Sequence, residues 1–235
     1  MEQLDICVCT LTFNEIEILP MYYRQIKKFA SSWVVIDHGS DDGTIEFLLR
    51  KQKKGEMDIT IEVSPTPNFH GNFFRELNRV FRKSNRSWTW KGFPDEIPSR
   101  NTPQVLKRLI ESPKKIYWVK RAVITSLFPL KIRENKYRPQ LWPTEWNLGY
   151  DDRFGHVHQE DLRFNNKQFP VERIDEIQIY DIGECRNIEK VREKELAYES
   201  LGPTILTSRW NEERRERNIR NSQDFYDGDF INLLV

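Results

Sequence analysis

Short apolar runs alternate, in the first part of the chain, with longer segments in which apolar residues recur every three or four positions. Residues 6–12 and 33–37 are mostly apolar runs of the kind that form buried strands, and 58–63 alternates between apolar and polar residues. Between these runs, apolar residues fall at helical spacing over 14–29 and over 44–51. The order strand, helix, strand, helix, strand predicts an α/β fold with a parallel sheet covered by helices.

The pattern continues toward the middle of the chain. Helices are expected over 73–81 and 102–112, and strands over 87–93 and 117–125. Asn14, with Glu17 three residues on, predicts the start of the first helix. Residues 126–170 are rich in Pro, Trp, Asn and Asp, which predicts long loops with short strands. From 188 to 218 the pattern is helical and strongly charged, and no repeat or linker divides the chain, so we expect a single domain over 1–235.

Composition narrows the classes of partner. The 235 residues carry a formal net charge of +1, which gives no case for nucleic acid or an anionic membrane as the main partner. Three cysteines do not make a disulfide framework. The sequence does not open with a basic leader and an apolar stretch, and no run approaches the roughly 18 apolar residues of a membrane span. We therefore expect a soluble, cytoplasmic protein, at most peripheral at a membrane.

Polar residues stand where the first two predicted strands end. The first strand runs into Thr12, Asn14 and Glu15, and the second into Asp37 and a turn with Gly39, Ser40 and Asp42. In an open α/β sheet, ligands bind in the crevice beyond the carboxyl ends of the strands. An acid at the end of an apolar strand, such as Asp37, needs a partner that offsets its desolvation. A nucleobase or ribose is one such partner, and the backbone amides of the following turn are the other.

The segments 12–15, Thr-Phe-Asn-Glu, and 37–44, Asp-His-Gly-Ser-Asp-Asp-Gly-Thr, together resemble the family 2 glycosyltransferases, which move a sugar from a nucleotide-sugar donor. The resemblance implies a GT-A-type, Rossmann-like fold with a mainly parallel, twisted sheet flanked by helices. It divides the domain into a nucleotide-sugar-binding half (1–100), an acceptor half (101–185) and a helical C-terminal extension (186–235). In that family the acid matching Asp37 contacts the nucleoside, and His38 departs from the acid common at the next position.

The resemblance also implies a metal-assisted diphosphate site. Nucleotide-sugar transfer often uses a divalent cation, and carboxylates suit Mn²⁺ or Mg²⁺. The family carries Asp-x-Asp, often followed by Glu, where this chain has Phe93 to Glu96. Asp95 and Glu96 are therefore the expected metal ligands, with Phe93 in place of the first Asp. An acidic loop without a metal is the alternative.

Other residues are assigned to the same chemistry by their place in the chain. Related folds often use a late histidine as a further metal ligand, which points to His158, with His156 in reserve. The family often has a glycine followed by an arginine and an asparagine at helical spacing, and Gly71, Arg75 and Asn78 fit this pattern. The match places Arg75 near the donor diphosphate, although an exposed helix arginine is an equal reading. Transfer with inversion needs a general base on the acceptor hydroxyl, and Asp152 and Glu160 are the candidates.

The acceptor is expected to be a glycan or another molecule with a hydroxyl group. Trp142 lies in a stretch rich in aromatic residues, and aromatic faces stack on sugar rings. The ring is therefore a candidate acceptor platform, and core packing is the equal alternative.

Two other functions stay open. A nucleotidyltransferase on a similar sheet usually has a glycine-rich loop after the first strand, and 10–15 contains no glycine. A degenerate protein of the same fold, kept for binding or scaffolding, is favoured by Phe93 but disfavoured by Asp95 with the pair His156 and His158. A nucleic-acid-binding module is disfavoured by the neutral charge balance.

Overall fold

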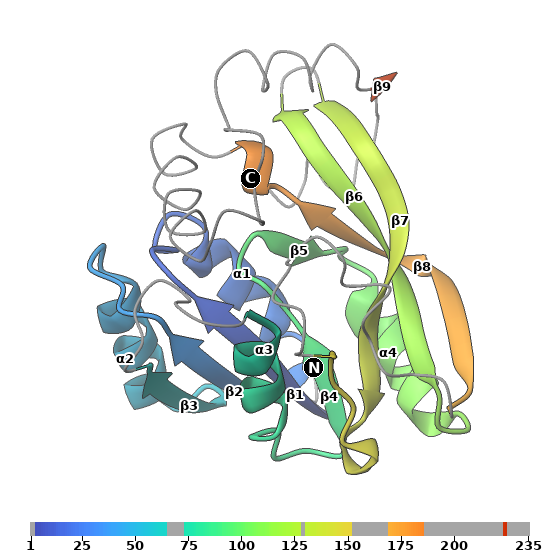
Figure 1. The fold of residues 1–235 in the computed structure, drawn as a ribbon, viewed down its shortest axis with the longest axis horizontal. Coiled ribbons are helices and arrows are strands. Elements are labelled where there is room, and N and C mark those ends of the chain that lie inside the picture. The colour runs from blue at the N-terminus through green and yellow to red at the C-terminus, as the bar shows by residue number, and fades with distance from the viewer. Residues whose placement is uncertain (1–2, 65–72, 128–129, 152–168, 186–222, 225–235) are drawn as a thin grey trace.

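The structure is a computed structural model of residues 1–235, and it describes residues 3–64, 73–127, 130–151, 169–185 and 223–224 (Figure 1). Its elements, in chain order, are β1 (Leu4–Thr12), α1 (Leu19–Ile26), β2 (Ala30–Asp37), α2 (Thr44–Lys54), β3 (Asp58–Val63), α3 (Phe73–Phe81), β4 (Trp88–Lys91), β5 (Glu96–Pro98), α4 (Thr102–Glu111), β6 (Ile116–Leu127), β7 (Leu130–Pro143), the 3-10 helix η2 (Thr144–Trp146), β8 (Val171–Asp181), the 3-10 helix η4 (Gly183–Cys185) and β9 (Gln223–Asp224).

The described strands form one sheet in the order β3-β2-β1-β4-β7-β6-β8-β5, with β9 paired to β7. Strands β3, β2, β1 and β4 run parallel to one another. Strand β7 enters antiparallel between β4 and β6, and β5 pairs antiparallel with β8 at the far edge. The expected α/β fold with a largely parallel, helix-flanked sheet is confirmed, and the antiparallel strands make its second half mixed.

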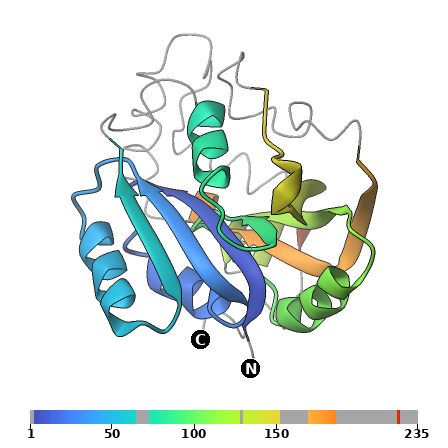
Figure 2. The ribbon, with the colours of Figure 1, turned by 90° about the horizontal axis from the view of Figure 1, so that it is seen from below.

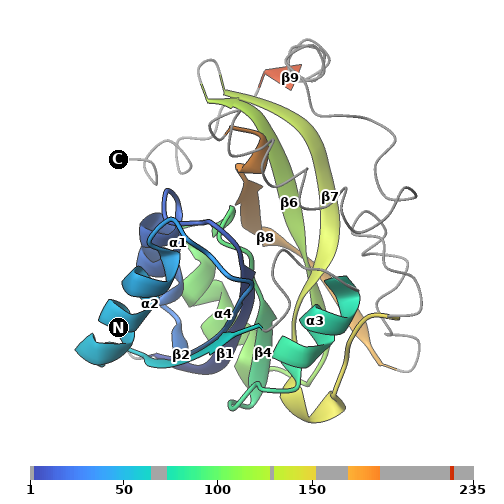
Figure 3. The same ribbon diagram turned by 60° about the vertical axis from the view of Figure 1, so that its left-hand side comes forward.

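Both faces of the first strands are buried, which is why β1 and β2 read as continuous apolar runs. On one face, Ile6 and Val8 pack with residues of α1 and α2, and on the other, Cys7 and Cys9 pack with residues of α3. Figure 3 shows α1 and α2 on one side of this part of the sheet and α3 on the other. Figure 2 shows α2 in light blue and α4 in green at opposite ends of the sheet.

The expectation of loops over 126–170 is wrong for residues 130–143. Strands β6 and β7 form a long antiparallel hairpin that extends well past β4 (Figure 1). Only the end of β7, from Leu141 to Pro143, pairs with β4. The outer part carries charged residues on both faces and a proline at 139, so it lacks the apolar alternation that marks a half-buried strand.

The expected helical extension over 186–235 lies almost wholly outside the described residues. Its one described part, Gln223–Asp224, is a short strand on β7. Among the helices that the structure describes, none is long and apolar enough to cross a membrane.

Candidate functional site

The loops that follow β1 and β2 lie side by side at the carboxyl edge of the sheet. The two strands are in parallel register up to the pair Thr12 and Asp37, so both loops leave the sheet at the same level. Strand β4 is parallel to β1 on its other side and pairs through Lys91 with Cys9. The segment after β4, which holds Asp95, therefore emerges at the same edge. We call this group of strand ends the carboxyl rim.

Asp37 is fully buried and accepts four hydrogen bonds from its own chain. One carboxylate oxygen accepts the backbone N–H groups of Gly39 (2.9 Å) and Ser40 (2.8 Å). The other accepts the hydroxyls of Thr12 (2.8 Å) and Ser40 (2.6 Å). A carboxylate offers about four lone-pair sites, so these bonds fill its acceptor capacity. Of the two partners left open by the sequence, this geometry favours the turn amides.

Side chains also cross-link the two loops. The backbone N–H groups of Asn14, Glu15 and Ile16 donate to the side chains of Ser40 (2.8 Å), Thr44 (2.9 Å) and Asp42 (3.1 Å), in that order. In return, the Asn14 amide oxygen accepts the N–H of Asp41 at 3.0 Å. The Glu15 side chain is 2% exposed at this junction. The first loop is therefore held in one conformation by the second.

The expected helix start at Asn14 is wrong. Helix α1 begins at Leu19, with a proline in its first turn, and Asn14 adopts a positive φ of 54°. The reason is that its side chain serves the neighbouring loop rather than the helix. Gly43, at φ 98°, occupies a left-handed position just before α2, where a residue with a Cβ would be strained.

Helix α3 packs over the opposite side of the β2 end. His38 is fully buried, and its Nε2 lies 3.9 Å from a carboxylate oxygen of Glu76. Burial raises the pKa of the Glu76 carboxyl, although the cations of Arg75 and Arg82 oppose this. Arg75 itself is exposed on α3. Gly71, expected to precede it, lies outside the described residues.

Asn78, which the resemblance groups with Arg75, has a different partner. Its side chain both donates to the carbonyl and accepts the N–H of Tyr150, each at 2.8 Å. The Tyr150 ring stacks on Phe74 at 4.9 Å between centroids. Asn78 therefore ties α3 to the segment that follows β7.

The acids after β4 occupy two different environments. Asp95 is half-buried, whereas Glu96 is 4% exposed and lies 3.2 Å from the Nε of Arg121. Arg121 also bonds Asp181 at the end of β8. The Phe93 ring stacks on Phe73, 5.9 Å between centroids.

Asp95 and Glu96 are the expected ligands of a divalent cation. Mg²⁺ and similar ions are commonly held by one or two carboxylates together with substrate phosphates. Asp95 fits that role, because the carboxylate of Glu96 is already paired with a cation. Within the described part of the chain, no group of three or more His, Cys, Asp or Glu side chains could hold a metal by itself. A bound ion would therefore need ligands from outside these described side chains.

Several expected residues cannot be placed. His156, His158, Asp152 and Glu160 all lie in 152–168, outside the described residues. Trp142 is described and is 1% exposed, with its ring edge-on to Phe81 at 5.0 Å. This burial favours core packing, the alternative that the sequence left open.

Three charged residues were not among the predicted site residues: Asp181, Arg121 and Lys91. Asp181 carries a signal that could have found it, because an apolar strand ends in Asp with Gly two residues later, as at Asp37 and Gly39. Arg121 has no local signal, since its partners come from other strands. Lys91 is fully buried at the end of β4, with its ammonium 5.6 Å from the centre of the Phe93 ring.

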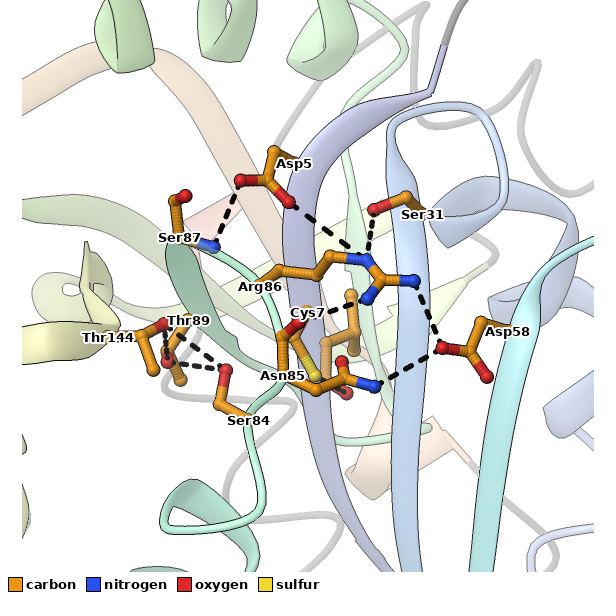
Figure 4. A network of polar contacts seen from close by, with 11 residues as sticks. Asp5, Cys7, Ser31, Asp58, Ser84, Asn85, Arg86, Ser87, Thr89 and Thr144 are labelled. Carbon is orange, nitrogen blue, oxygen red and sulfur yellow. Dashed lines mark hydrogen bonds and ion pairs between the residues drawn. The ribbon is translucent and has the colours of Figure 1, made fainter.

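A second polar cluster lies at the opposite, amino-terminal edge of the sheet (Figure 4). It borders an open cavity of about 500 Å³. Arg86 donates to Ser31 (2.9 Å) and Asp58 (3.0 Å), and Lys114 pairs with Glu145 at 2.6 Å. Because these charges are paired with one another, the cluster is explained as a junction between strands and loops.

Cys7 lies beside this cluster (Figure 4), fully buried. Its sulfur is 3.9 Å from that of Cys9. That thiol contact lowers the pKa of Cys7 to about 6, against the opposing effect of burial. Among the described residues, all three cysteines are free thiols.

Comparisons with known proteins bear on the fold. No family model matches the sequence, and no curated protein matches it. Residues 1–349 of S. aureus TarS match with 13% identity and a TM-score of 0.57, over 92% of this chain and 69% of that one. The same fragment in complex with UDP-GlcNAc matches with 12% identity and a TM-score of 0.54, over 91% and 70%.

The mannosyltransferase PcManGT from Pyrobaculum calidifontis, in complex with GDP-Man and Mn²⁺, matches with 13% identity and a TM-score of 0.57. That match covers 83% of this chain and 61% of the other, so this chain corresponds to less than two thirds of the mannosyltransferase. At such identities the likeness concerns the fold. The chain has a fold found in structures that bind nucleotide sugars, among them a glycosyltransferase.

Proposed function

We propose that the chain is a glycosyltransferase of the family 2 type, which moves a sugar from a nucleotide-diphosphate sugar to a hydroxyl of a glycan or similar acceptor. The observation that carries this proposal is the carboxyl rim, where the loops after β1 and β2 and the segment with Asp95 meet at one edge of the sheet. Ligands of open α/β sheets bind at such an edge. The nucleotide sugars bound by the structural neighbours support the same assignment.

The cross-linked loops supply the floor of the proposed donor site. Because Asp37 is engaged within its turn, we assign it to shaping this floor together with Thr12 and Ser40. The proposed nucleoside contacts are then Asn14 on the first loop and the backbone around Gly39 to Asp42, and the buried Glu15 stays a predicted contact. Such prearranged loops bind with a smaller loss of conformational freedom than loops that order on binding.

Asp95 is the proposed holder of the diphosphate end, and Arg75 stays a predicted contact of the same diphosphate. A divalent cation, Mn²⁺ or Mg²⁺, would act there as a Lewis acid that neutralises charge on the leaving diphosphate. Glu96, His158 and His156 stay predictions as further ligands. The Mn²⁺ in the mannosyltransferase complex supports divalent-metal use.

The proposed reaction inverts the configuration at the anomeric carbon. A carboxylate, for which Asp152 and Glu160 are the candidates, takes the proton of the acceptor hydroxyl. The acceptor oxygen then forms a bond to the anomeric carbon as the bond from that carbon to the diphosphate oxygen breaks. The nucleoside diphosphate leaves with the bonding electron pair.

A thermal-shift panel tests this function. UDP, GDP, CDP, dTDP and their sugars are each added with and without Mn²⁺ to wild type and to Asp95→Ala. Asp175→Ala serves as the control, since Asp175 is an exposed acid on β8 that bonds Lys120 and Tyr137. A ligand that binds only the folded state, at a free concentration of 100 times its Kd, raises the free energy of unfolding by about 2.7 kcal/mol.

We expect one nucleotide to raise the melting temperature in a Mn²⁺-dependent way in wild type and Asp175→Ala, but not in Asp95→Ala. The absence of any shift in folded wild type would contradict the proposal. The second candidate, a binding protein without activity, is favoured by Phe93 in the acid position. It predicts nucleotide binding without any turnover of the nucleotide sugar to free nucleoside diphosphate.

A further inference from the structure

The turn after β8 lies directly against Asp95. The backbone N–H of Ile182 donates to the Asp95 carbonyl at 2.9 Å, and the N–H of Gly183 donates to the side chain of Asp181 at 2.9 Å. We call residues 181–183 the β8 turn. It fixes the main chain of Asp95 from a segment more than 80 residues away in the sequence.

Gly183 leaves room for two carboxylates. A Cβ at this position would lie 3.1 Å from a carboxylate oxygen of Asp95 and 3.2 Å from one of Asp181. Gly183 is not among the described glycines with a positive φ, so its backbone would accept alanine without strain. The glycine is therefore needed for space, and the space that it leaves is filled by Asp95 and Asp181.

Arg121 pairs with two acids near Asp95, namely Glu96 and Asp181. It reaches from β6 to Glu96 on β5 and to Asp181 on β8. Glu96 is 4% and Asp181 is 7% exposed, so both carboxylates benefit from a cation in contact. The arginine therefore joins β6, β5 and β8 beside the segment that holds Asp95.

We propose that the β8 turn and Arg121 position the Asp95 carboxylate for the metal–diphosphate group of the donor. Asp181 and Gly183 are then positioning residues of the donor site, contributed by the half of the chain assigned to the acceptor. This inference rests on the proposed function. It goes further by naming residues that act on the donor through Asp95.

A role in positioning differs measurably from a role in stability alone. Residues that orient a metal ligand typically change metal affinity by about 10- to 100-fold when they are mutated. Residues that act through the same ligand are also non-additive with it in a double mutant. A residue that only stabilises the fold would lower the melting temperature and leave the affinity of the folded protein for Mn²⁺ unchanged.

The test is a Mn²⁺ titration followed by electron paramagnetic resonance, in the presence of whichever of UDP or GDP stabilises wild type more. The variants are Gly183→Ala, Asp181→Asn, Asp95→Ala and the double variant Asp95→Ala/Gly183→Ala. Asp175→Asn is the matched control, because it changes an exposed acid on the same strand. Circular dichroism at the titration temperature confirms that each variant is folded.

We expect Gly183→Ala and Asp181→Asn each to weaken Mn²⁺ binding by about tenfold or more, with Asp175→Asn equal to wild type. In the Asp95→Ala background, Gly183→Ala should cause no further loss. A folded Gly183→Ala and Asp181→Asn with wild-type affinity would overturn this inference and leave the proposed function intact. A folded wild type that binds neither Mn²⁺ nor nucleotide would overturn both.

Discussion

At the scale of single residues, Asp37 is an acid at a strand end whose hydrogen bonds stabilise the loops of its own chain. Its four hydrogen bonds hold the turn from Gly39 to Ser40 and the hydroxyl of Thr12 on the neighbouring strand. Removal of the carboxylate would leave the buried Thr12 hydroxyl and the half-buried Ser40 donors without an acceptor, and such donors are costly. The residue therefore acts on a ligand mainly through the shape of the two loops.

Asp37→Ala should lower the free energy of unfolding by about 3 kcal/mol, since hydrogen bonds to a charged group contribute about 1.5–3 kcal/mol each and partial relaxation recovers some of the loss. Urea unfolding followed by circular dichroism measures this. Asp41→Ala, which removes an exposed acid of the same turn, should change stability by less than about 0.5 kcal/mol. Equal stabilities of the two variants would contradict the role given to Asp37.

At the scale of elements, helix α3 is fixed through one side chain. Asn78 pairs with both backbone groups of Tyr150, much as a neighbouring strand would, and the ring of Tyr150 stacks on Phe74. The close approach of Gly149 to the Asn78 amide leaves no room there for a Cβ. Helix α3, which lies beside the proposed donor site, is thus connected to the chain just before residues 152–168.

Asn78→Ala should cost about 2 kcal/mol, because it leaves the N–H and C=O of Tyr150 without these partners in a half-buried position. It should also increase hydrogen exchange of the Tyr150 amide far more than that of amides in β1. Asn85→Ala is the control, since Asn85 is exposed and its side-chain amide donates to the exposed Asp58 carboxylate. Unchanged hydrogen exchange of the Tyr150 amide in Asn78→Ala would contradict the role of Asn78 in holding α3 to Tyr150.

Local signals explain which elements the sequence could predict. The β1 and β2 runs and the helices α2, α3 and α4 carry their own periodicity, so they could be placed within a few residues. The outer part of β7 could not, because its sequence is dense in charged residues and lacks the apolar alternation of a half-buried strand. Likewise, Asp37 could be predicted because it ends an apolar strand. Arg121 could not, because its partners lie on β5 and β8, far away in the sequence.

At the scale of the whole molecule, one apolar core joins the two halves. The cluster that contains Ile6 and Val8 of β1 also contains Ile177 and Ile179 of β8. The sheet is continuous through the pairing of β4 with β7. The predicted donor and acceptor halves therefore share one core and are not separate folding units.

We expect the described core to unfold in one cooperative step. Tryptophan fluorescence, with Trp33 in the first half and Trp142 in the second, should give the same midpoint in urea as far-UV circular dichroism. Because the chain has seven tryptophans, the signal of each residue is taken as the difference between wild type and the variant Trp33→Phe or Trp142→Phe, and both differences should report the same transition. Two midpoints that differ between these variants would show that the halves unfold independently.

The position of β1 in the middle of the parallel strands has a consequence for protein synthesis. Strand β1 pairs with β2 and with β4, yet Trp88 follows its partner Ile6 by about 80 residues. At about 5–20 residues per second, a nascent chain holds β1 for on the order of 4–16 s before that neighbour exists. During this time the edge of β1 that pairs with β4 has no partner strand. The rate of translation across this interval and the chaperones near the exit tunnel should therefore govern the yield of folded protein.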